Sequence, residues 1–138
     1  MQITRIFHSG FLVETAKRYF IFDYYKGELP KLNPDKPVYV FASHGHQDHY
    51  EPKVFELLKQ QGIVPKLAIL AKDIKEKKYP DGIPVLKAGF NAHYEIEADF
   101  LVDTFHSTDA GVAYLVTCGE GKIYHAGDLH DWVFDSAS

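Results

Sequence analysis

Three histidines and one aspartate lie within the six residues 44–49, and they follow directly on the apolar run 38–42. Imidazole nitrogen and carboxylate oxygen are ligands that zinc and neighbouring first-row metals accept. In an extended segment, side chains two residues apart point the same way, so His44 and His46 can bind one ion together. Asp48 and His49 follow where the chain turns and can face a second ion. The spacing favours a two-metal site, which makes a nucleophile from water at neutral pH, over a histidine-rich turn without metal.

The composition predicts one soluble globular domain. The chain has 138 residues, 46% hydrophobic and 14% aromatic, which suffices for one core but not for two domains. Its formal charge of −4 disfavours a general nucleic-acid binder, which needs a basic face. The N-terminal residues lack the features of a signal peptide, and no apolar run approaches the roughly 20 residues that span a bilayer. Cys118 is the one cysteine and suits a core position better than a nucleophilic one, so we expect a reducing, cytoplasmic location.

Short β-branched and aromatic runs with polar breaks between them predict a chain rich in strands. We expect antiparallel hairpins at the start, then a loop over 26–37 that holds three prolines and a glycine. The buried strand over 38–42 would deliver the histidines. The expected strands are 2–8, 11–15, 19–23, 38–42, 66–71, 85–86, 92–96, 99–105, 111–117 and 122–125.

Two segments have helical features. A helix is expected to begin near Pro52 and to stop at Gly62, because proline is tolerated in a first helical turn and glycine often ends a helix. The segment 73–78 is a possible short, charged helix. The basic residues in and beside that segment are expected to form a solvated face, not a nucleic-acid surface; they are Lys72, Lys75, Lys77 and Lys78.

Two further ligand-type residues follow predicted strands later in the chain. His106 comes directly after the strand 99–105, and Asp128 follows the strand 122–125 through a Gly-Asp turn. Loops at strand ends gather functional side chains. Either residue alone is a weak signal, but in this order behind the histidine cluster they predict a completed metal centre.

The chain resembles the metallo-β-lactamase superfamily, and within it the branch of small metal-dependent hydrolases that includes the ascorbate-6-phosphate lactonase type. The matching features are His44-x-His46-x-Asp48-His49, His106 before Ser107-Thr108-Asp109, the turn Ala126-Gly127-Asp128, the opening His8-Ser9-Gly10-Phe11-Leu12 and the strand end Ile21-Phe22-Asp23. The resemblance implies an α/β fold of the α+β type. This is the αββα sandwich, in which two β-sheets pack face to face with helices outside.

The resemblance also implies a role for each residue of the centre. His44, His46 and His106 would bind a first divalent ion, Asp48 and His49 a second, and Asp128 would bridge them. A hydroxide held between the ions would attack an ester, lactone, amide or phosphodiester, and Asp48 would orient it or carry its proton. Zinc is the expected metal for so many imidazoles, although manganese, iron and nickel accept the same ligands.

Members of the superfamily usually continue well beyond the Gly-Asp turn, to a last histidine on the second metal. This chain stops at Ser138. We therefore expect a single incomplete domain, 1–138, that holds the first half of the sandwich and a little more and is truncated at its C-terminus. An incomplete sandwich would expose an apolar sheet face, so either the gene product is shortened or a homodimer covers that face.

Two functions remain open at this stage. The first is a metal-dependent hydrolase acting on a small-molecule substrate, with no membrane partner. The second is a catalytically impaired metal-binding or assembly module. A nuclease of the same superfamily is disfavoured, because the chain is acidic and has no basic stripe.

Other polar residues could support the centre. Asp23 is expected either to hydrogen-bond the metal loop or a ligand histidine, as carboxylates behind metal ligands do, or to serve only its turn. His125 is expected to be packed in a strand or to stand behind the ligands. His8 could lie near the cleft, and His130 could replace the missing last ligand, although a supporting or exposed role suits His130 better. Tyr50 and Trp132 could line a substrate cleft, but aromatic residues are more often core or rim.

Overall fold

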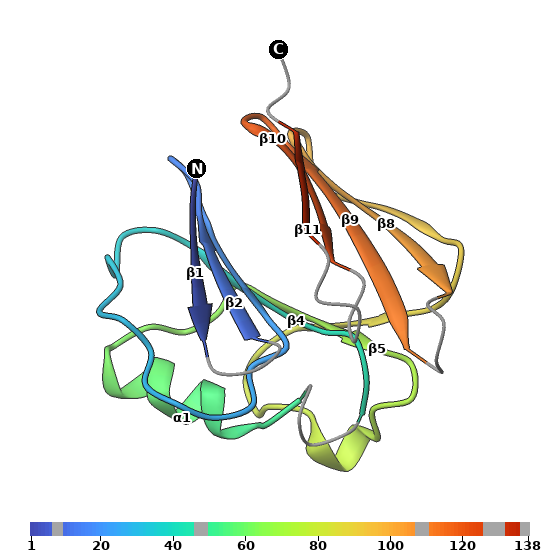
Figure 1. The fold of residues 1–138 in the computed structure, drawn as a ribbon. Coiled ribbons are helices and arrows are strands. Elements are labelled where there is room, and N and C mark those ends of the chain that lie inside the picture. Colours follow the sequence, from blue (N-terminus) through green and yellow to red (C-terminus); the bar gives the residue numbers. More distant parts are fainter. Residues whose placement is uncertain (7–9, 46–49, 107–110, 126–131, 136–138) are drawn as a thin grey trace.

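The computed structural model describes residues 1–6, 10–45, 50–106, 111–125 and 132–135, and the strands in this part form two sheets (Figure 1). The first sheet has six strands, in the order β1 (Gln2–Ile6), β2 (Gly10–Glu14), β3 (Tyr19–Phe22), β4 (Val38–Ala42), β5 (Leu67–Ala71) and β6 (Val85–Ala88). The second has five, in the order β11 (Trp132–Asp135), β10 (Gly121–His125), β9 (Val112–Cys118), β8 (Phe100–His106) and β7 (His93–Glu97).

Strand direction in the first sheet determines where the loops gather. The strands β1, β2 and β3 pair antiparallel, which confirms the hairpins expected at the start. From β3 to β6 the pairing is parallel. The carboxyl ends of parallel strands meet at one edge of a sheet. The residues after β3, β4, β5 and β6 therefore lie side by side at that edge.

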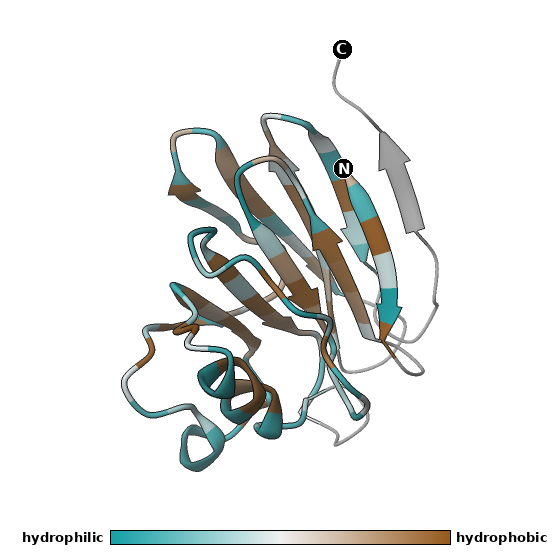
Figure 2. Cartoon of the chain, turned by 90° about the vertical axis from the view of Figure 1, so that its left-hand side faces the viewer, coloured by the Kyte–Doolittle hydropathy of each residue, from teal (hydrophilic) through white to brown (hydrophobic). Residues whose placement is uncertain are grey.

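Alternation along the inner strands of the first sheet builds two cores. Val38 and Val40 of β4 face one side, where they pack with Val54 and Leu58 of α1 (Lys53–Gln60). Tyr39, between them, belongs to the core on the other side. Since both faces are covered, β4 can be apolar at every position, whereas the edge strand β1 alternates hydrophilic and hydrophobic residues (Figure 2).

The second sheet closes the inner core. Phe100 of β8 is fully buried, and its ring centroid lies 5.1 Å from that of Phe20 and 4.8 Å from that of Tyr39 in the first sheet. Val102, Tyr114, Val116 and Ile123 of the second sheet join the same core. The chain thus supplies two sheets that cover each other, so the apolar inner face expected to lie open is covered from within the chain.

Among the described residues, α1 is the single α-helix, and it covers the outer face of the first sheet (Figure 1). It begins after Pro52 and is followed by Gly62 at a φ of 75°, as the sequence predicts. None of the described helices is long and apolar enough to cross a membrane.

Two elements differ from the expectation. The possible helix over 73–78 is instead a loop with one 3₁₀ turn (Glu76–Lys78), flanked by Lys75 and Tyr79 in extended conformations. Repulsion among neighbouring lysines and the lack of a buried apolar stripe leave a helix there with little support. Strand β11 was not expected; it pairs antiparallel with β10, the strand before it in the chain.

The outer face of the second sheet carries mixed side chains, because strands alternate between their two faces. Leu101, Phe105 and Leu115 share this face with Asp103 and Thr117, and Phe105 is 41% exposed. The helix α1 lies against the other sheet. Within the described part of the chain, α1 therefore leaves this mixed face uncovered.

An arginine in the β2–β3 turn joins the two sheets. The Arg18 guanidinium donates to the carboxylates of Glu97 and Asp99, each at 2.6 Å, and lies 5.1 Å from the centre of the Phe100 ring. Hydrogen bonds from Arg18 lower the pKa of Asp99 to about 2 and, together with a bond from Lys66, also lower the pKa of Glu97. This cluster closes the end of the sandwich where the β2–β3 and β7–β8 turns meet.

The cluster predicts a loss of stability in acid. Both carboxyl pKa values lie lower in the folded chain than in the unfolded one, so the unfolded chain binds more protons as the pH falls. The contribution is complete above the ordinary glutamate pKa of 4.5 and is lost as the pH approaches about 2. Urea unfolding of the wild type and of Arg18→Gln, at several pH values between about 6 and 3, measures the contribution of this cluster to the free energy of unfolding. As the pH falls, the free energy of unfolding should decrease less in Arg18→Gln than in the wild type. An equal decrease in both proteins would mean that the cluster does not contribute to stability.

Candidate metal centre

The predicted metal-ligand segment begins at the carboxyl edge of the first sheet. Strand β4 ends at Ala42, and Ser43 and His44 follow as fully buried residues. His44 is 1% exposed, which is unusual for a side chain with two polar ring nitrogens. The buried strand therefore delivers the first histidine into the interior, as the sequence predicts.

Gly111, just before β9, leaves the room that the His44 ring occupies. A methyl group built on Gly111 would lie 2.3 Å from both Cε1 and Nε2 of His44, closer than carbon atoms approach in folded proteins. Any other residue at this position would displace the imidazole. Sequence reasoning missed this role, because nothing in the local pattern shows that residue 111 meets residue 44.

His106 reaches the same end of the molecule on the second sheet. It ends β8 and pairs with Val112 of β9, whose amide N–H donates to the Ser43 carbonyl at 2.9 Å. His44 and His106 therefore lie on either side of the start of β9. The His106 ring packs against Phe90, with 4.4 Å between ring centroids. The structure thus brings together the two predicted ligands that it describes.

The other predicted ligands lie outside the described residues; they are His46, Asp48, His49 and Asp128. The catalytic role predicted for Asp48 falls there too, as do His8 and His130. Within the described part alone, no group of three or more histidine, cysteine or acidic side chains could hold a metal. The structure therefore shows where His44 and His106 lie, and all six ligand roles remain predictions.

A buried aspartate connects three strand ends behind the centre. Asp23, directly after β3, accepts hydrogen bonds from the Ser43 amide at 2.7 Å and from the Ser43 hydroxyl. It also bonds Nε2 of His125, the last residue of β10, at 2.8 Å. Because an ionised carboxylate only accepts, Nε2 of His125 carries the proton in this pair.

This network decides between the roles expected for Asp23. It holds the residue before His44, so the structure favours support of the metal loop over a plain turn role. Asp23 also has a φ of 51°, a left-handed conformation that aspartate tolerates better than most residues do. His125 is buried among the same groups, as the sequence predicts for a packed or supporting histidine.

A tyrosine fastens the second sheet to the end of β4. The Tyr114 hydroxyl donates to the Ala42 carbonyl at 2.9 Å. Burial, followed by the nearby Asp23 charge, raises the pKa of Tyr114 well above its usual value, so the phenol keeps its proton and remains a donor. Sequence reasoning assigned no role to this residue.

Tyr50 has a structural role in place of the substrate-cleft role considered for it. It is buried, and its hydroxyl donates to the carbonyl of Lys78 in the loop after β5. At the other end of the predicted ligand segment, the Gly45 amide donates to Oδ2 of Asp73 at 3.0 Å. The loop over 72–78 is therefore bonded to both described ends of the segment.

These observations fit a metal centre. The imidazole of His44 is enclosed in a space that exists because Gly111 has no side chain, and His106 lies across the start of β9 from it. Imidazole nitrogens suit zinc and its first-row neighbours. A buried carboxylate behind the first histidine is the support that metal-binding segments commonly have.

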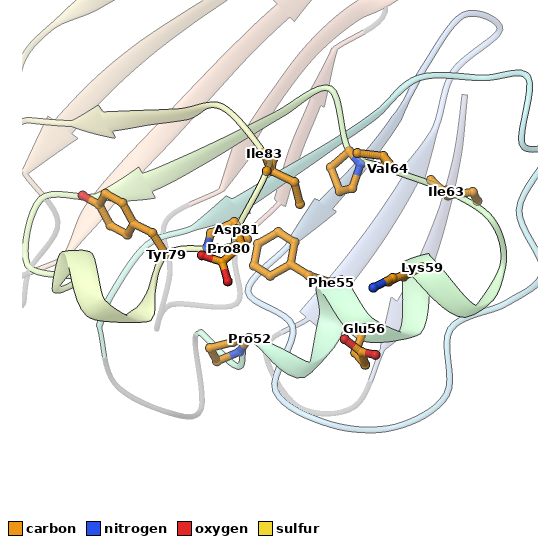
Figure 3. Close-up of a pocket in the computed structure, with 12 residues that line it drawn as sticks. Pro52, Phe55, Glu56, Lys59, Ile63, Val64, Tyr79, Pro80, Asp81 and Ile83 are labelled. Atoms are coloured by element: carbon orange, nitrogen blue, oxygen red, sulfur yellow. The ribbon is translucent and has the colours of Figure 1, made fainter.

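A cavity of about 540 Å³ lies away from this centre, between α1 and the loop 79–83 (Figure 3). Phe55 points into it from the helix, and Tyr79, Pro80 and Ile83 line the opposite side. Neither His44 nor His106, the two predicted ligands that the structure describes, is among the residues that line it. The cavity therefore lies apart from the described part of the candidate metal centre.

Comparison with known proteins finds relatives that are named metal-dependent. Two curated relatives are both named "UPF0173 metal-dependent hydrolase". The one from Korarchaeum cryptofilum is 27% identical over 142 residues, which covers 93% of this chain and 60% of the relative. The one from Pyrobaculum arsenaticum is 26% identical over 140 residues, which covers 93% of this chain and 61% of the relative. The chain thus spans about 60% of the length of these relatives.

A solved structure shares the fold. Igni18, described as a metallo hydrolase from Ignicoccus hospitalis, matches with a TM-score of 0.62 at 16% identity, over 91% of this chain and 59% of its own. The model of the family described as "Beta-lactamase superfamily domain" matches residues 2–136. The chain therefore belongs to the beta-lactamase superfamily domain family.

Proposed function

We propose that the chain is a metal-dependent hydrolase of the branch that includes the ascorbate-6-phosphate lactonase type, acting on a small-molecule ester, lactone, amide or phosphodiester. The observation that carries the proposal is the meeting of two sheets at the predicted ligands. His44 is enclosed against Gly111, and His106 pairs with the next residue, Val112. The family match and the names of the two relatives support the same reaction class.

In this proposal, His44, His46 and His106 would hold a first divalent ion, Asp48 and His49 would hold a second, and Asp128 would serve both. Zinc is the proposed metal, with manganese, iron or nickel as possible replacements. When bound, such a pair lowers the pKa of water and polarises the substrate oxygen. Asp48 would orient the attacking water and take up its proton. Asp23 would keep Ser43, and with it His44, in place while the substrate binds.

Metal content per chain tests the ligand assignment. Elemental analysis should find two metal ions per chain, on protein whose oligomeric state has been determined by light scattering. His44→Ala and His46→Ala should each empty the first position, since both imidazoles follow the same buried strand. His93→Ala is the matched control, because His93 is 58% exposed and bonds Asp103 on the outer surface. Unchanged metal content in both His44→Ala and His46→Ala would show that the assignment is wrong.

The same measurement separates the second proposed function, a metal-binding or assembly module without turnover. One ion or none per chain, with no hydrolysis of aryl esters, would support the module.

We also propose a homodimer that covers the outer face of the second sheet through Leu101, Phe105 and Leu115. Light scattering on the same samples tests this proposal.

A further inference from the structure

A second cavity adjoins the candidate metal centre. Its volume is about 240 Å³, and it is lined by Gly45, Asp73, Lys75, Lys77 and Lys78. Gly45 directly follows His44, so the cavity begins at the metal-ligand segment itself. The volume is several times the share of one water in the liquid, about 30 Å³, so a phosphate group fits inside it.

The lysine loop, residues 72–78, is held against the ligand segment. Oδ2 of Asp73 accepts from the Gly45 amide at 3.0 Å, and the Lys78 carbonyl accepts from the Tyr50 hydroxyl. Ile74 anchors the loop in the core at 2% exposure. A side chain at residue 45 would lie 3.1 Å from the Asp73 carbonyl oxygen, so the two segments are closely packed. The lysines are therefore fixed beside the centre, although their ends face solvent.

The lining of this cavity is positively charged in a protein that is acidic overall. Three lysines and one aspartate line it, which leaves a net charge of +2 (3 − 1), whereas the whole chain carries −4. Among the described residues, no salt bridge is formed by Lys75, Lys77 or Lys78, while Lys17, Lys36 and Lys66 each have a carboxylate partner. Like charges that line one cavity repel one another, and a bound anion would stabilise them.

A fourth lysine lies near the second described ligand, His106. The ammonium group of Lys72 lies 4.1 Å from the centre of the Phe90 ring, which itself packs against the His106 ring. Lysines thus lie near both described ligands. Those of the cavity lie beside Gly45, which follows His44, and Lys72 lies over the Phe90 ring that packs against His106. This arrangement follows from the parallel strands, whose carboxyl ends place the loops after β4, β5 and β6 at one edge.

We propose that the lysine cavity binds the phosphate group of a small phosphorylated substrate whose scissile bond lies at the adjacent metal centre. The inference rests on the proposed function and adds the substrate class to it. Lysine is a common phosphate ligand and acts as a point charge. A nucleic acid is disfavoured as the ligand, because the positive charge is confined to one loop and does not extend into a stripe.

Binding of inorganic phosphate to the metal-loaded protein tests the cavity. Backbone amide shifts in NMR spectra would follow a phosphate titration of the wild type, of the triple variant Lys75→Gln/Lys77→Gln/Lys78→Gln and of the control Lys122→Gln. Lys122 is an exposed lysine in β10, and like the other three it can be changed without disturbing the core. We expect shifts at Gly45 and in the lysine loop, and a phosphate affinity at least about tenfold weaker in the triple variant than in the control. Equal affinities would overturn the inference.

Hydrolysis kinetics provide the second readout. With a phosphorylated aryl ester, the triple variant should raise KM about tenfold and leave kcat unchanged, because the lost contacts are made equally before and during the reaction. With a neutral aryl ester, neither parameter should change. If the triple variant changed KM equally for the two esters, the result would contradict phosphate recognition. Tighter binding of a single-stranded RNA than of phosphate, lost steeply with salt, would replace the inference with a nucleic-acid surface.

The two proposals can fail separately. If the protein holds no metal and hydrolyses neither ester, the proposed function fails, while the same phosphate titration of the metal-free protein still decides whether the cavity binds an anion. If metal binding and hydrolysis are present but the triple variant behaves like Lys122→Gln, the proposed function stands and the lysine cavity has no part in substrate binding.

Discussion

Replacing Asp23 with alanine should lower the free energy of unfolding by about 3–5 kcal/mol, because each buried donor left without an acceptor costs roughly 1–3 kcal/mol. The carboxylate is fully buried and accepts from the Ser43 amide, the Ser43 hydroxyl and Nε2 of His125. Alanine would leave these donors in the interior with no acceptor in that place. It would also be held at a φ of 51°, which alanine tolerates less well than aspartate. Urea unfolding at neutral pH, in one defined metal state, measures the loss.

The same variant should also bind metal about 10–100-fold more weakly, because this is the usual effect of removing a hydrogen-bonding group that orients metal ligands. The matched control is Asp103→Ala, which removes another aspartate from a histidine, this time on the surface. The His93–Asp103 pair is partly exposed, so its loss should change stability by at most about 1 kcal/mol and leave metal binding unaltered. If the two variants unfold at the same urea concentration, the buried network does not stabilise the protein.

Gly111→Ala should disrupt the centre by adding a single methyl group. That methyl would lie 2.3 Å from two atoms of the His44 imidazole and 2.7 Å from a third, and the ring has no open space to move into at 1% exposure. Overpacking of this kind costs about 1–3 kcal/mol, and the displaced ring can no longer meet a metal in the original geometry. We expect a metal affinity at least about tenfold lower, measured by competition with a chromogenic chelator.

Gly119→Ala separates this steric effect from the general effect of replacing glycine. A methyl group on Gly119 would meet its nearest neighbour, Oδ2 of Asp99, at 3.7 Å, an ordinary contact distance. Its stability should change by less than about 0.5 kcal/mol and its metal affinity should not change. Wild-type metal binding in Gly111→Ala would mean that the His44 ring does not take part in the centre.

Local patterns in the sequence predicted the elements near the centre well. The apolar run 38–42 is strand β4 with the same boundaries, because a segment buried on both faces has to be apolar throughout. Pro52 and Gly62 mark the ends of α1 for reasons that act within one turn of chain. The segment 73–78 was wrongly expected as a possible helix, because its backbone conformation depends on contacts with Gly45 and Tyr50.

The sequence by itself supplied the predicted metal ligands and placed His44 just after a buried strand, because strand periodicity and the donor chemistry of each residue are local properties. Contacts across the two sheets were decided only by the tertiary structure. Gly111 makes room for a ring 67 positions earlier in the chain (111 − 44), Asp23 bonds a histidine 102 positions later, and the loop 72–78 brings its lysines beside Gly45. Such contacts follow from strand order and sheet packing, and a short stretch of sequence does not show which distant residues it will contact.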